Sequence, residues 1–202
     1  MNRSSKSRGE QRANTLPNRL RIIAGRWRGV PITFPPRPEL RPTPDRVRET
    51  IFNWLQPMIV NARVLDLFAG SGALGFESLS RGAATAVLVD RDVQIVRHLQ
   101  ETATKLRADN VECVTSDAGA YLARSPQSFD IVFLDPPYAA GVLTSICTRL
   151  AEGWLAPGAL VYLENPADDG LPALPSAWSV HRSKRAGQVG YHLLRTSLED
   201  SP

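Results

Sequence analysis

Residues 64–75 read Val-Leu-Asp-Leu-Phe-Ala-Gly-Ser-Gly-Ala-Leu-Gly, an apolar run that passes into a glycine-rich turn. The first five residues have the composition of a buried strand, and the residues after Gly72 have the apolar spacing of a helix. Gly70, Gly72 and Gly75 satisfy the G-x-G-x-x-G pattern, in which glycine lets the backbone come close to a ligand. Asp90 ends the next expected strand, about twenty residues on, where an acid can accept hydrogen bonds from ribose hydroxyls. The stretch therefore predicts a nucleotide-binding α/β fold.

Strand-like and helix-like segments alternate outward from this turn. The expected strands are residues 63–68, 85–89, 111–115, 129–134 and 159–164, and the expected helices are residues 45–57, 72–81, 92–107, 118–123 and 143–152. Two further strand-like runs, 178–182 and 188–195, follow with no helix between them. Alternation of this kind predicts a doubly wound, mostly parallel seven-stranded sheet covered on both faces, and the last pair predicts an antiparallel C-terminal edge.

The glycine-rich turn by itself suits a nicotinamide dinucleotide as well as it suits S-adenosylmethionine. A tight turn without a ligand is a weaker alternative, because the strand, turn, helix, next strand and terminal acid of a nucleotide site are all present. Asp66, inside the strand, suits the positively charged amino group of a methionine better than it suits a pyrophosphate. Asp117 follows the third strand and can reach an adenine amino group, cap the next helix, or do both. The candidate cofactor-binding residues are Asp66, Phe68, Ala69, Gly70, Ser71, Gly72, Asp90, Arg91, Asp117 and Ala118.

A second turn, Asp135-Pro136-Pro137-Tyr138, ends the apolar run of residues 129–134. One interpretation is a rigid turn with a surface tyrosine. In a doubly wound sheet, however, ligands lie at the carboxyl ends of the central strands. Proline has no backbone N–H, so Pro136 can offer only its carbonyl oxygen. This carbonyl and the Asp135 carboxylate form a pair of acceptors for the two hydrogens of an NH₂ group. Tyr138 can stack on the base to which that NH₂ group is attached. These four residues are the candidate catalytic residues.

Hydrogen bonds to both N–H groups of an exocyclic amine localise electron density on its nitrogen. Alignment of that nitrogen with a sulfonium methyl group then supplies much of the rate enhancement. The chemistry needs no metal, and the sequence offers none of the usual ligand spacings among Cys113, Cys147 and its three histidines. We expect both cysteines to be free, buried thiols in a reducing compartment.

Basic residues are concentrated near the N-terminus. Half of the lysines and arginines lie within residues 1–48, where only Glu10, Glu39 and Asp45 oppose them. Such a block favours a phosphate-rich partner, although residues 1–18 equally suit a disordered, solubilising tail. From Arg19, apolar and basic residues interleave as in a small hairpin, and residues 35–44 hold five prolines, as in a linker. The candidate RNA-binding residues are Arg21, Arg26, Arg28, Arg46 and Arg48.

Several runs together resemble one known family. They are residues 21–29 (RIIAGRWRG), 40–55 (LRPTPDRVRETIFNWL), 65–75 (LDLFAGSGALG), 135–138 (DPPY) and 186–191 (AGQVGY). In this order, and between Arg19 and Arg195, they resemble the bacterial 16S rRNA guanine-N2 methyltransferase family known as RsmD. The tail before Leu16 is longer than we expect of that family.

The resemblance implies a Rossmann-like class I methyltransferase fold with a small N-terminal β-hairpin extension. It also implies methylation, with S-adenosyl-L-methionine, of the N2 of one guanine in a 16S rRNA loop, free or within an assembling 30S subunit. Without the resemblance, the residues predict only that the methyl acceptor is an amino group on a planar base. Methylation of adenine N6 and methylation of DNA therefore remain alternatives. A nicotinamide-dependent oxidoreductase and a non-catalytic RNA-binding protein are further ones.

We expect three parts: a disordered basic tail over residues 1–18, an RNA-binding hairpin and linker over residues 19–44, and a methyltransferase domain over residues 45–197. The N-terminus lacks the apolar core of a secretory signal, and no apolar run is long enough to cross a bilayer. We therefore expect a monomeric, cytoplasmic protein without a structural metal or a membrane partner.

Overall fold

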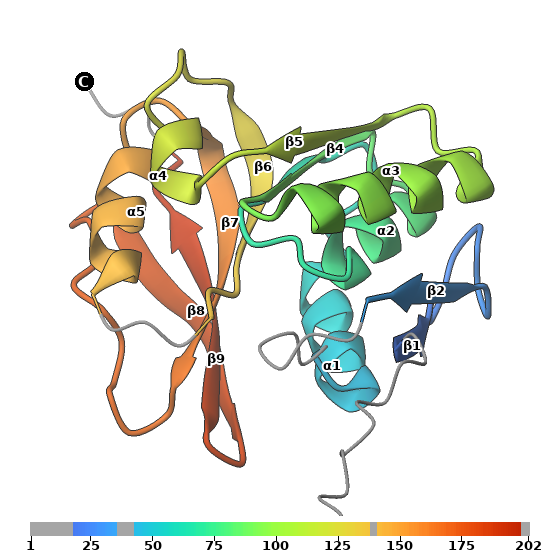
Figure 1. Cartoon of the computed structure of the whole chain (residues 1–202). Helices are drawn as coiled ribbons and strands as arrows, with labels where there is room; N and C mark the ends of the chain where they lie inside the picture. Colours follow the sequence, from blue (N-terminus) through green and yellow to red (C-terminus); the bar gives the residue numbers. More distant parts are fainter. Residues whose placement is uncertain (1–17, 36–42, 138–140, 199–202) are drawn as a thin grey trace, which may run out of the picture.

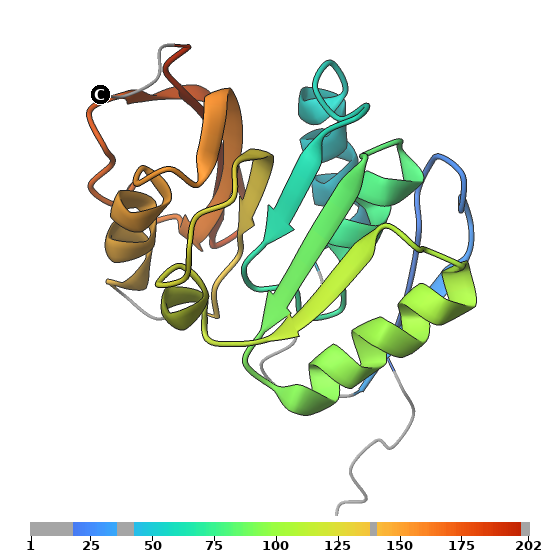
Figure 2. The same cartoon turned by 90° about the horizontal axis from the view of Figure 1, so that it is seen from above.

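The structure, a computed structural model, describes residues 18–35, 43–137 and 141–198. Its centre is a seven-stranded sheet in the order β5-β4-β3-β6-β7-β9-β8, with helices on both faces (Figures 1 and 2). The strands are β3 (Arg63–Asp66), β4 (Thr85–Asp90), β5 (Val111–Thr115), β6 (Phe129–Leu134), β7 (Leu155–Pro166), β8 (Trp178–Ala186) and β9 (Val189–Thr196). The expected α/β class, mostly parallel sheet and antiparallel edge are confirmed.

The strand order reverses direction at β3. The chain runs outward from β3 through β4 to β5, and then returns to place β6 on the other side of β3. The pairs from β5 to β7 are parallel, whereas β9 runs antiparallel to both β7 and β8. In open α/β sheets, ligands bind in the crevice at such a reversal, beyond the carboxyl ends of the strands. The fold therefore places the candidate site at the ends of β3 and β6.

Two apolar clusters cover the two faces of the sheet. One lies under α1 (Asp45–Leu55), α2 (Ala73–Ser80) and α3 (Val93–Leu106), and the other lies under α4 (Ala118–Tyr121) and α5 (Val142–Leu150). The central strands are apolar on both sides, because helices exclude water from both faces of a parallel sheet.

The N-terminal extension packs on the first of these faces. Its strands β1 (Asn18–Arg21) and β2 (Pro31–Phe34) form a separate antiparallel pair, as the sequence predicted. Five of its side chains belong to the same apolar cluster as α1, α2 and α3: Leu20, Ile22, Trp27, Ile32 and Phe34. Figure 1 shows the pair beside these helices. The expected tail lies outside the described residues except for Asn18, and so does most of the proline-rich linker.

Aspartate side chains cap the starts of α3 and α4, and the sequence predicted the second of these caps. The Asp92 carboxylate accepts a hydrogen bond from Gln94 N at the start of α3, and Asp117 caps α4 in the same way. The sequence also suggests Asp45 as the N-cap of the helix expected from residue 45, and this prediction was wrong: Pro44 is the N-cap of α1, and Asp45 is the first helical residue. Proline has no side-chain acceptor, and the Asp45 carboxylate instead accepts a hydrogen bond from Arg48.

Two strands are longer than their local sequence predicts. β7 continues to Pro166 and β8 to Ala186, because both pair with β9 along most of its length. Backbone pairing extends these strands through residues that lack an alternating apolar pattern.

The cysteines match the prediction only in part. Both are free, and Cys147 is buried, but Cys113 is half-buried rather than fully buried. Burial raises the pKa of the Cys147 thiol to about 12 and that of Cys113 to about 11. Among residues 18–35, 43–137 and 141–198, no helix is long and apolar enough to cross a membrane. The same residues contain no group of three or more side chains placed to hold a metal ion.

Candidate active site at the strand carboxyl ends

The glycine-rich turn joins β3 to α2 through two left-handed residues. Gly70 has φ 49° and Gly72 has φ 76°, a region that glycine enters without steric cost. A Cβ on Gly72 would lie 2.6 Å from the Phe76 ring. Ala69 N donates to Val89 O over 2.9 Å, which ties the turn to β4. The local sequence and the packing therefore require glycine at Gly72, and the turn is fixed beside the end of β4.

Asp90 lies against this turn. Its Oδ2 accepts from Gly70 N over 3.0 Å, and its Oδ1 accepts from Asp92 N over 2.9 Å. Each oxygen keeps a further lone pair for a ligand hydroxyl. Arg91 follows on the exposed side.

Asp117 lies at the end of the neighbouring strand. Ser116 N donates to Asp90 O over 2.9 Å, so the ends of β4 and β5 are adjacent. The exposed Asp117 carboxylate accepts from Gly119 N over 2.8 Å, and Ala118 beside it is buried. The capping role of Asp117 is confirmed, while its contact with an adenine stays a prediction.

Three carboxyl groups meet at the carboxyl ends of β3, β6 and β7. Asp66 pairs with Phe133 across β3 and β6, and the pairing of Leu134 with Leu163 brings Asp135 beside Glu164. Hydrogen bonding between the Asp135 and Glu164 carboxyls couples the two groups. We call Asp66, Asp135 and Glu164 the acidic cluster.

Neutral hydroxyl groups, rather than cations, contact two members of the acidic cluster. The Thr43 hydroxyl donates to Asp135 Oδ2 over 3.3 Å, and the Tyr162 hydroxyl donates to Glu164 Oε1 over 2.5 Å. The ion pairs formed within residues 18–35, 43–137 and 141–198 include none to these three carboxyls.

Burial raises the pKa of each carboxyl in the acidic cluster. The pKa of Asp66, which is 2% exposed, rises to about 7, mainly through burial and further through the charge of Asp90. The pKa of Asp135 rises well above its ordinary value through burial, the Glu164 charge and the Asp66 charge. The pKa of Glu164 rises through burial. Such groups are stabilised by a ligand that brings positive charge or N–H donors, and this is the chemistry of an ammonium group and an amine.

Sequence reasoning missed Thr43, Tyr162 and Glu164 as parts of this site. Glu164 carries the same signal as Asp66 and Asp90, since each is an acid at the end of an apolar strand run. That signal was sufficient to identify Glu164. Thr43 comes from the expected linker, and nothing in its local pattern points to Asp135.

Of the predicted catalytic turn, three residues are described. Asp135 and Pro136 are partly exposed, and Pro137 is exposed. Tyr138 lies outside the described residues, so its stacking role stays a prediction.

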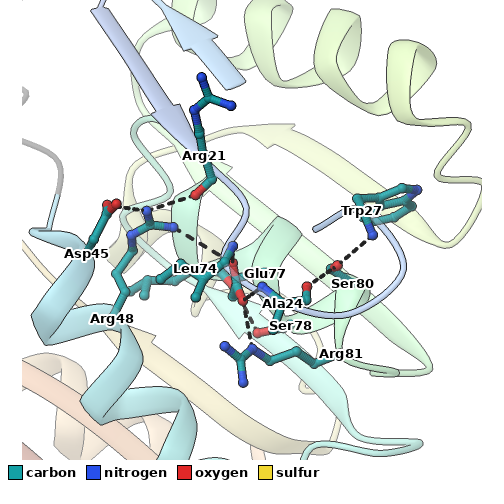
Figure 3. Close-up of polar contacts among 11 residues, drawn as sticks. Arg21, Ala24, Trp27, Asp45, Arg48, Leu74, Glu77, Ser78, Ser80 and Arg81 are labelled. Atoms are coloured by element: carbon teal, nitrogen blue, oxygen red, sulfur yellow. Dashed lines mark hydrogen bonds and ion pairs between the residues drawn. The ribbon is translucent and has the colours of Figure 1, made fainter. Parts of the chain in front are cut away.

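Four of the five candidate RNA-binding arginines are exposed: Arg21, Arg26, Arg28 and Arg46. The prediction for Arg48 was wrong, because its side chain is completely buried. Its Nη2 donates to Arg21 O over 2.9 Å and to Asp45 Oδ1 over 2.6 Å, and its Nη1 lies 3.8 Å from Glu77 Oε2 (Figure 3). A guanidinium enclosed in this way does not reach a phosphate.

The buried pair of Arg48 and Glu77 attaches the N-terminal extension to α2. The Glu77 carboxylate accepts from Ile23 N over 2.7 Å and from Ala24 N over 3.0 Å, and Arg81 Nε donates to it over 2.7 Å. Ser80 adds a hydrogen bond from its hydroxyl to Ala24 O. Figure 3 shows these groups converging between α1, α2 and the extension. α2 begins at the glycine-rich turn, so the extension and the turn share one support.

Known proteins match most of the chain. Residues 20–195 match the family model described as "Conserved hypothetical protein 95". The chain is 49% identical over 181 residues to the ribosomal RNA small subunit methyltransferase D of Escherichia coli strain K12, covering 89% of this chain and 91% of the relative. It is 39% identical over 179 residues to the Haemophilus influenzae protein of the same name, covering 86% and 92%.

Solved structures agree on the fold. The putative methyltransferase yhhF from Escherichia coli is similar with a TM-score of 0.84 at 45% identity, covering 90% of this chain and all of that one. The expected Rossmann-like methyltransferase fold is thereby confirmed. With a family model and close relatives matching nearly its whole described length, the chain belongs to the ribosomal RNA small subunit methyltransferase D family.

Proposed function

We propose that the chain transfers a methyl group from S-adenosyl-L-methionine to the exocyclic N2 of a guanine in 16S rRNA. The observation that carries this proposal is the acidic cluster at the carboxyl ends of β3, β6 and β7, which offers acceptors and forms no ion pair with any cation in the part of the chain that the structure describes. Family membership favours methyl transfer over nicotinamide-dependent oxidoreduction.

The half of the site around β3, β4 and β5 suits the cofactor, which supplies a methyl group bound to a positively charged sulfur. Asp66 would hold the methionine ammonium, and its raised pKa fits a carboxyl that ionises when a cation arrives. Asp90 would accept from the ribose hydroxyls and Asp117 from the adenine amine. Backbone groups of the turn and of its neighbours would complete the contacts, with the residues Phe68, Ala69, Gly70, Ser71, Gly72, Arg91 and Ala118.

The half around β6 and β7 suits the acceptor base. Asp135 and the Pro136 carbonyl would accept from the two N–H groups of the amine and so raise its nucleophilicity. A carboxyl of raised pKa beside the reacting nitrogen is also suited to take up the proton that this nitrogen loses. Pro137 would hold the turn rigid, and Tyr138 would stack on the base.

Glu164 favours guanine over adenine in this arrangement. The pairing edge of guanine carries donors at both N1 and N2, whereas the corresponding N1 of adenine is an acceptor. Glu164, hydrogen-bonded to Asp135, would accept from the guanine N1–H. With Glu164 ionised, an adenine N1 would leave the Glu164 carboxylate facing a lone pair, and an unsatisfied buried acceptor costs about 1–3 kcal/mol.

The proposal is tested with S-adenosylmethionine that carries a tritiated methyl group, offered with 30S particles, deproteinised 16S rRNA or DNA. We expect label in rRNA, and nucleoside analysis should identify N2-methylguanosine. Asp135→Ala should abolish transfer while S-adenosylmethionine binding, measured by calorimetry, stays within about threefold, a change of less than 1 kcal/mol. N6-methyladenosine, or label in DNA alone, would contradict the proposal.

The same assay decides whether the substrate is free 16S rRNA or an assembling 30S subunit, because the better substrate of the two takes up more label. A protein that modifies ribosomal RNA would act in the cytoplasm, and we propose that it does so as a monomer. Sedimentation of the protein with and without rRNA tests the monomer.

A further inference from the structure

A basic hairpin at the C-terminal edge lies outside every role assigned above. β8 is the edge strand of the sheet, and all its residues from Ser179 to Ala186 are exposed. This segment contains Arg182, Lys184 and Arg185. The sequence placed all the candidate RNA-binding residues in the first 48 positions, so this second cationic segment was overlooked.

The hairpin forms one wall of a groove of about 350 Å³, and α1 forms the other. The groove is lined by Arg46, Val47, Thr50, Lys184, Arg185, Ala186 and Tyr191. Three of these seven residues are cationic and none is acidic. Cations from two elements that are remote in sequence therefore face one hollow, which suits a polyanion. Arg185 Nη1 also lies 3.1 Å from Asp168 Oδ1, an exposed ion pair that a phosphate would have to replace.

Aromatic contacts hold the two walls together. The Trp54 ring of α1 stacks on the Tyr191 ring of β9, with centroids 5.6 Å apart and planes inclined by 26°. The Lys184 ammonium lies over the same Trp54 ring, 5.9 Å from its centroid. Lys184 is thus positioned by packing on α1 as well as by strand pairing, so the groove is a built feature of the fold.

The groove leads to the acidic cluster. Tyr191, in the groove, pairs with Glu164 across β9 and β7. Side chains of directly opposed residues in an antiparallel pair project from the same face of the sheet. Glu164 in turn contacts Asp135. The floor of the groove therefore adjoins the carboxyls proposed to receive the base.

A second hollow of about 350 Å³ lies between β1 and the start of α1. It is lined by Arg19, Leu20, Arg21, Thr43, Pro44 and Asp45, and the Thr43 hydroxyl donates to Asp135. Arginines of the N-terminal extension and cations of the C-terminal hairpin thus flank the acidic cluster.

We infer that the β8–β9 hairpin is a second RNA-binding arm, in which Lys184 and Arg185, together with Arg46, hold backbone phosphates on one side of the target nucleotide. The N-terminal arginines would hold the strand on the other side. This inference rests on the proposed function for the identity of the RNA. The competing explanation is that lysine and arginine on an exposed edge strand only prevent edge-to-edge aggregation.

The test replaces both groove cations, Lys184→Gln with Arg185→Gln, and measures binding to a 16S rRNA fragment over a range of salt concentrations. Loss of two phosphate contacts should reduce the slope of log K against log salt by about 1.4–1.8, at roughly 0.7–0.9 per contact. The loss should appear in the KM for RNA, because the groove holds the strand and not the cofactor. S-adenosylmethionine affinity should not change.

The matched control is Arg97→Gln with Arg149→Gln, which removes the same charge from exposed positions on α3 and α5. The control should leave the salt slope at its original value. The variant Lys184→Arg with Arg185→Lys, which keeps both charges, should restore most of the slope. A slope that falls equally in the groove variant and the control, or in neither, overturns the inference and leaves the edge-strand explanation.

The outcome is separable from the proposed function. If the unaltered protein forms N2-methylguanosine but the groove variant binds RNA with an unchanged slope, only the second arm is wrong. If no N2-methylguanosine forms while the slope still falls, the groove binds RNA and the assignment of the reaction is wrong.

Discussion

Asp66 illustrates how a single buried carboxyl links protonation to ligand binding. Its burial raises its pKa to about 7, and the neighbouring Asp90 charge acts in the same direction. At neutral pH, in the absence of a cation, Asp66 is therefore about half protonated. A ligand that carries an ammonium group binds the ionised form and must displace the remaining proton.

The affinity for S-adenosylmethionine should therefore rise with pH. With a pKa of about 7, the ionised fraction of Asp66 rises about tenfold between pH 6 and pH 8. The association constant should rise by less, about fivefold, because the α-amino group of the ligand, with a pKa of about 7.7–8.0, loses part of its own positive charge by pH 8. Calorimetry in buffers of different ionisation enthalpy measures both the affinity and the released proton. Asp66→Asn should bind more weakly and without this pH dependence. A steep dependence that persists in Asp66→Asn would place the titrating group elsewhere.

The raised pKa of Asp66 has the opposite effect on the stability of the unliganded protein, which should fall as the pH rises. A carboxyl whose folded pKa exceeds its unfolded value binds more protons when folded, so its contribution to stability is present at low pH. That contribution is lost as the pH rises from 3.8, the ordinary pKa of an aspartate, towards the raised pKa of about 7. In urea titrations without cofactor, the free energy of unfolding of Asp66→Asn should fall less over this range than that of the unaltered protein. This comparison is the control for the binding experiment.

At the scale of elements, the contact between the N-terminal extension and α2 depends on a glycine. Gly25 has φ 82°, and a Cβ at this position would lie 1.8 Å from Ser80 O. The loop thus passes directly over the end of α2, where Arg26 N donates to Ser80 O over 2.7 Å. A side chain at Gly25 would separate the loop from the helix.

Gly29 provides the matched comparison. It has φ 79°, and a Cβ there would meet nothing within 4 Å. Both Gly25→Ala and Gly29→Ala should lower the free energy of unfolding by about 1–2 kcal/mol, because alanine is strained in the left-handed backbone conformation. Gly25→Ala should lose roughly 2 kcal/mol more, since the loop gives up at least two hydrogen bonds to Ser80, each worth about 0.5–1.5 kcal/mol.

Urea denaturation of both variants measures this difference. If both variants lose the same free energy of unfolding, the loop moves away from α2 without a loss of stability, and the extension is not held at Gly25. A larger loss in Gly25→Ala identifies the close approach, rather than backbone conformation, as the reason for glycine.

At the scale of the whole molecule, the extension and the central sheet share one apolar cluster. Trp27 and Phe34 of the extension belong to it together with Phe52 of α1 and Phe133 of β6. The buried Arg48 and Glu77 pair lies between the same elements. Removal of one partner from a buried pair costs about 3–5 kcal/mol, so the extension is expected to open only with the rest of the face.

Amide hydrogen exchange tests this cooperativity. The Ile22 and Val30 amides, which donate to Val30 O and Trp27 O, should exchange with free energies near the global value, on the order of 5–15 kcal/mol for a domain. Amides in β6 give the reference. If the free energy of opening at the Ile22 and Val30 amides is several kcal/mol lower than at the β6 amides, the extension unfolds by itself and is a separate unit.

The sequence by itself determined the class of the fold and the half of the site around β3. The glycine pattern at residues 70–75, the apolar strands and the Asp117 cap are local signals, because each depends on residues within one or two turns of chain. The placement of Asp135 at the carboxyl end of a central strand also followed from local pattern and the rules of doubly wound sheets. These parts were predictable because short-range sterics and periodicity decide them.

Tertiary structure alone decided which residues meet. Arg46 and Arg48 are two positions apart and identical in type, yet one lines an exposed groove and the other is completely buried against Glu77. Glu164 joins Asp135 only because the strand order places β7 beside β6, and Lys184 joins Arg46 only because β9 folds Tyr191 against Trp54. Such contacts depend on strand order and on the packing of distant segments, and the free energy that selects them comes from burial of surface that no local pattern records.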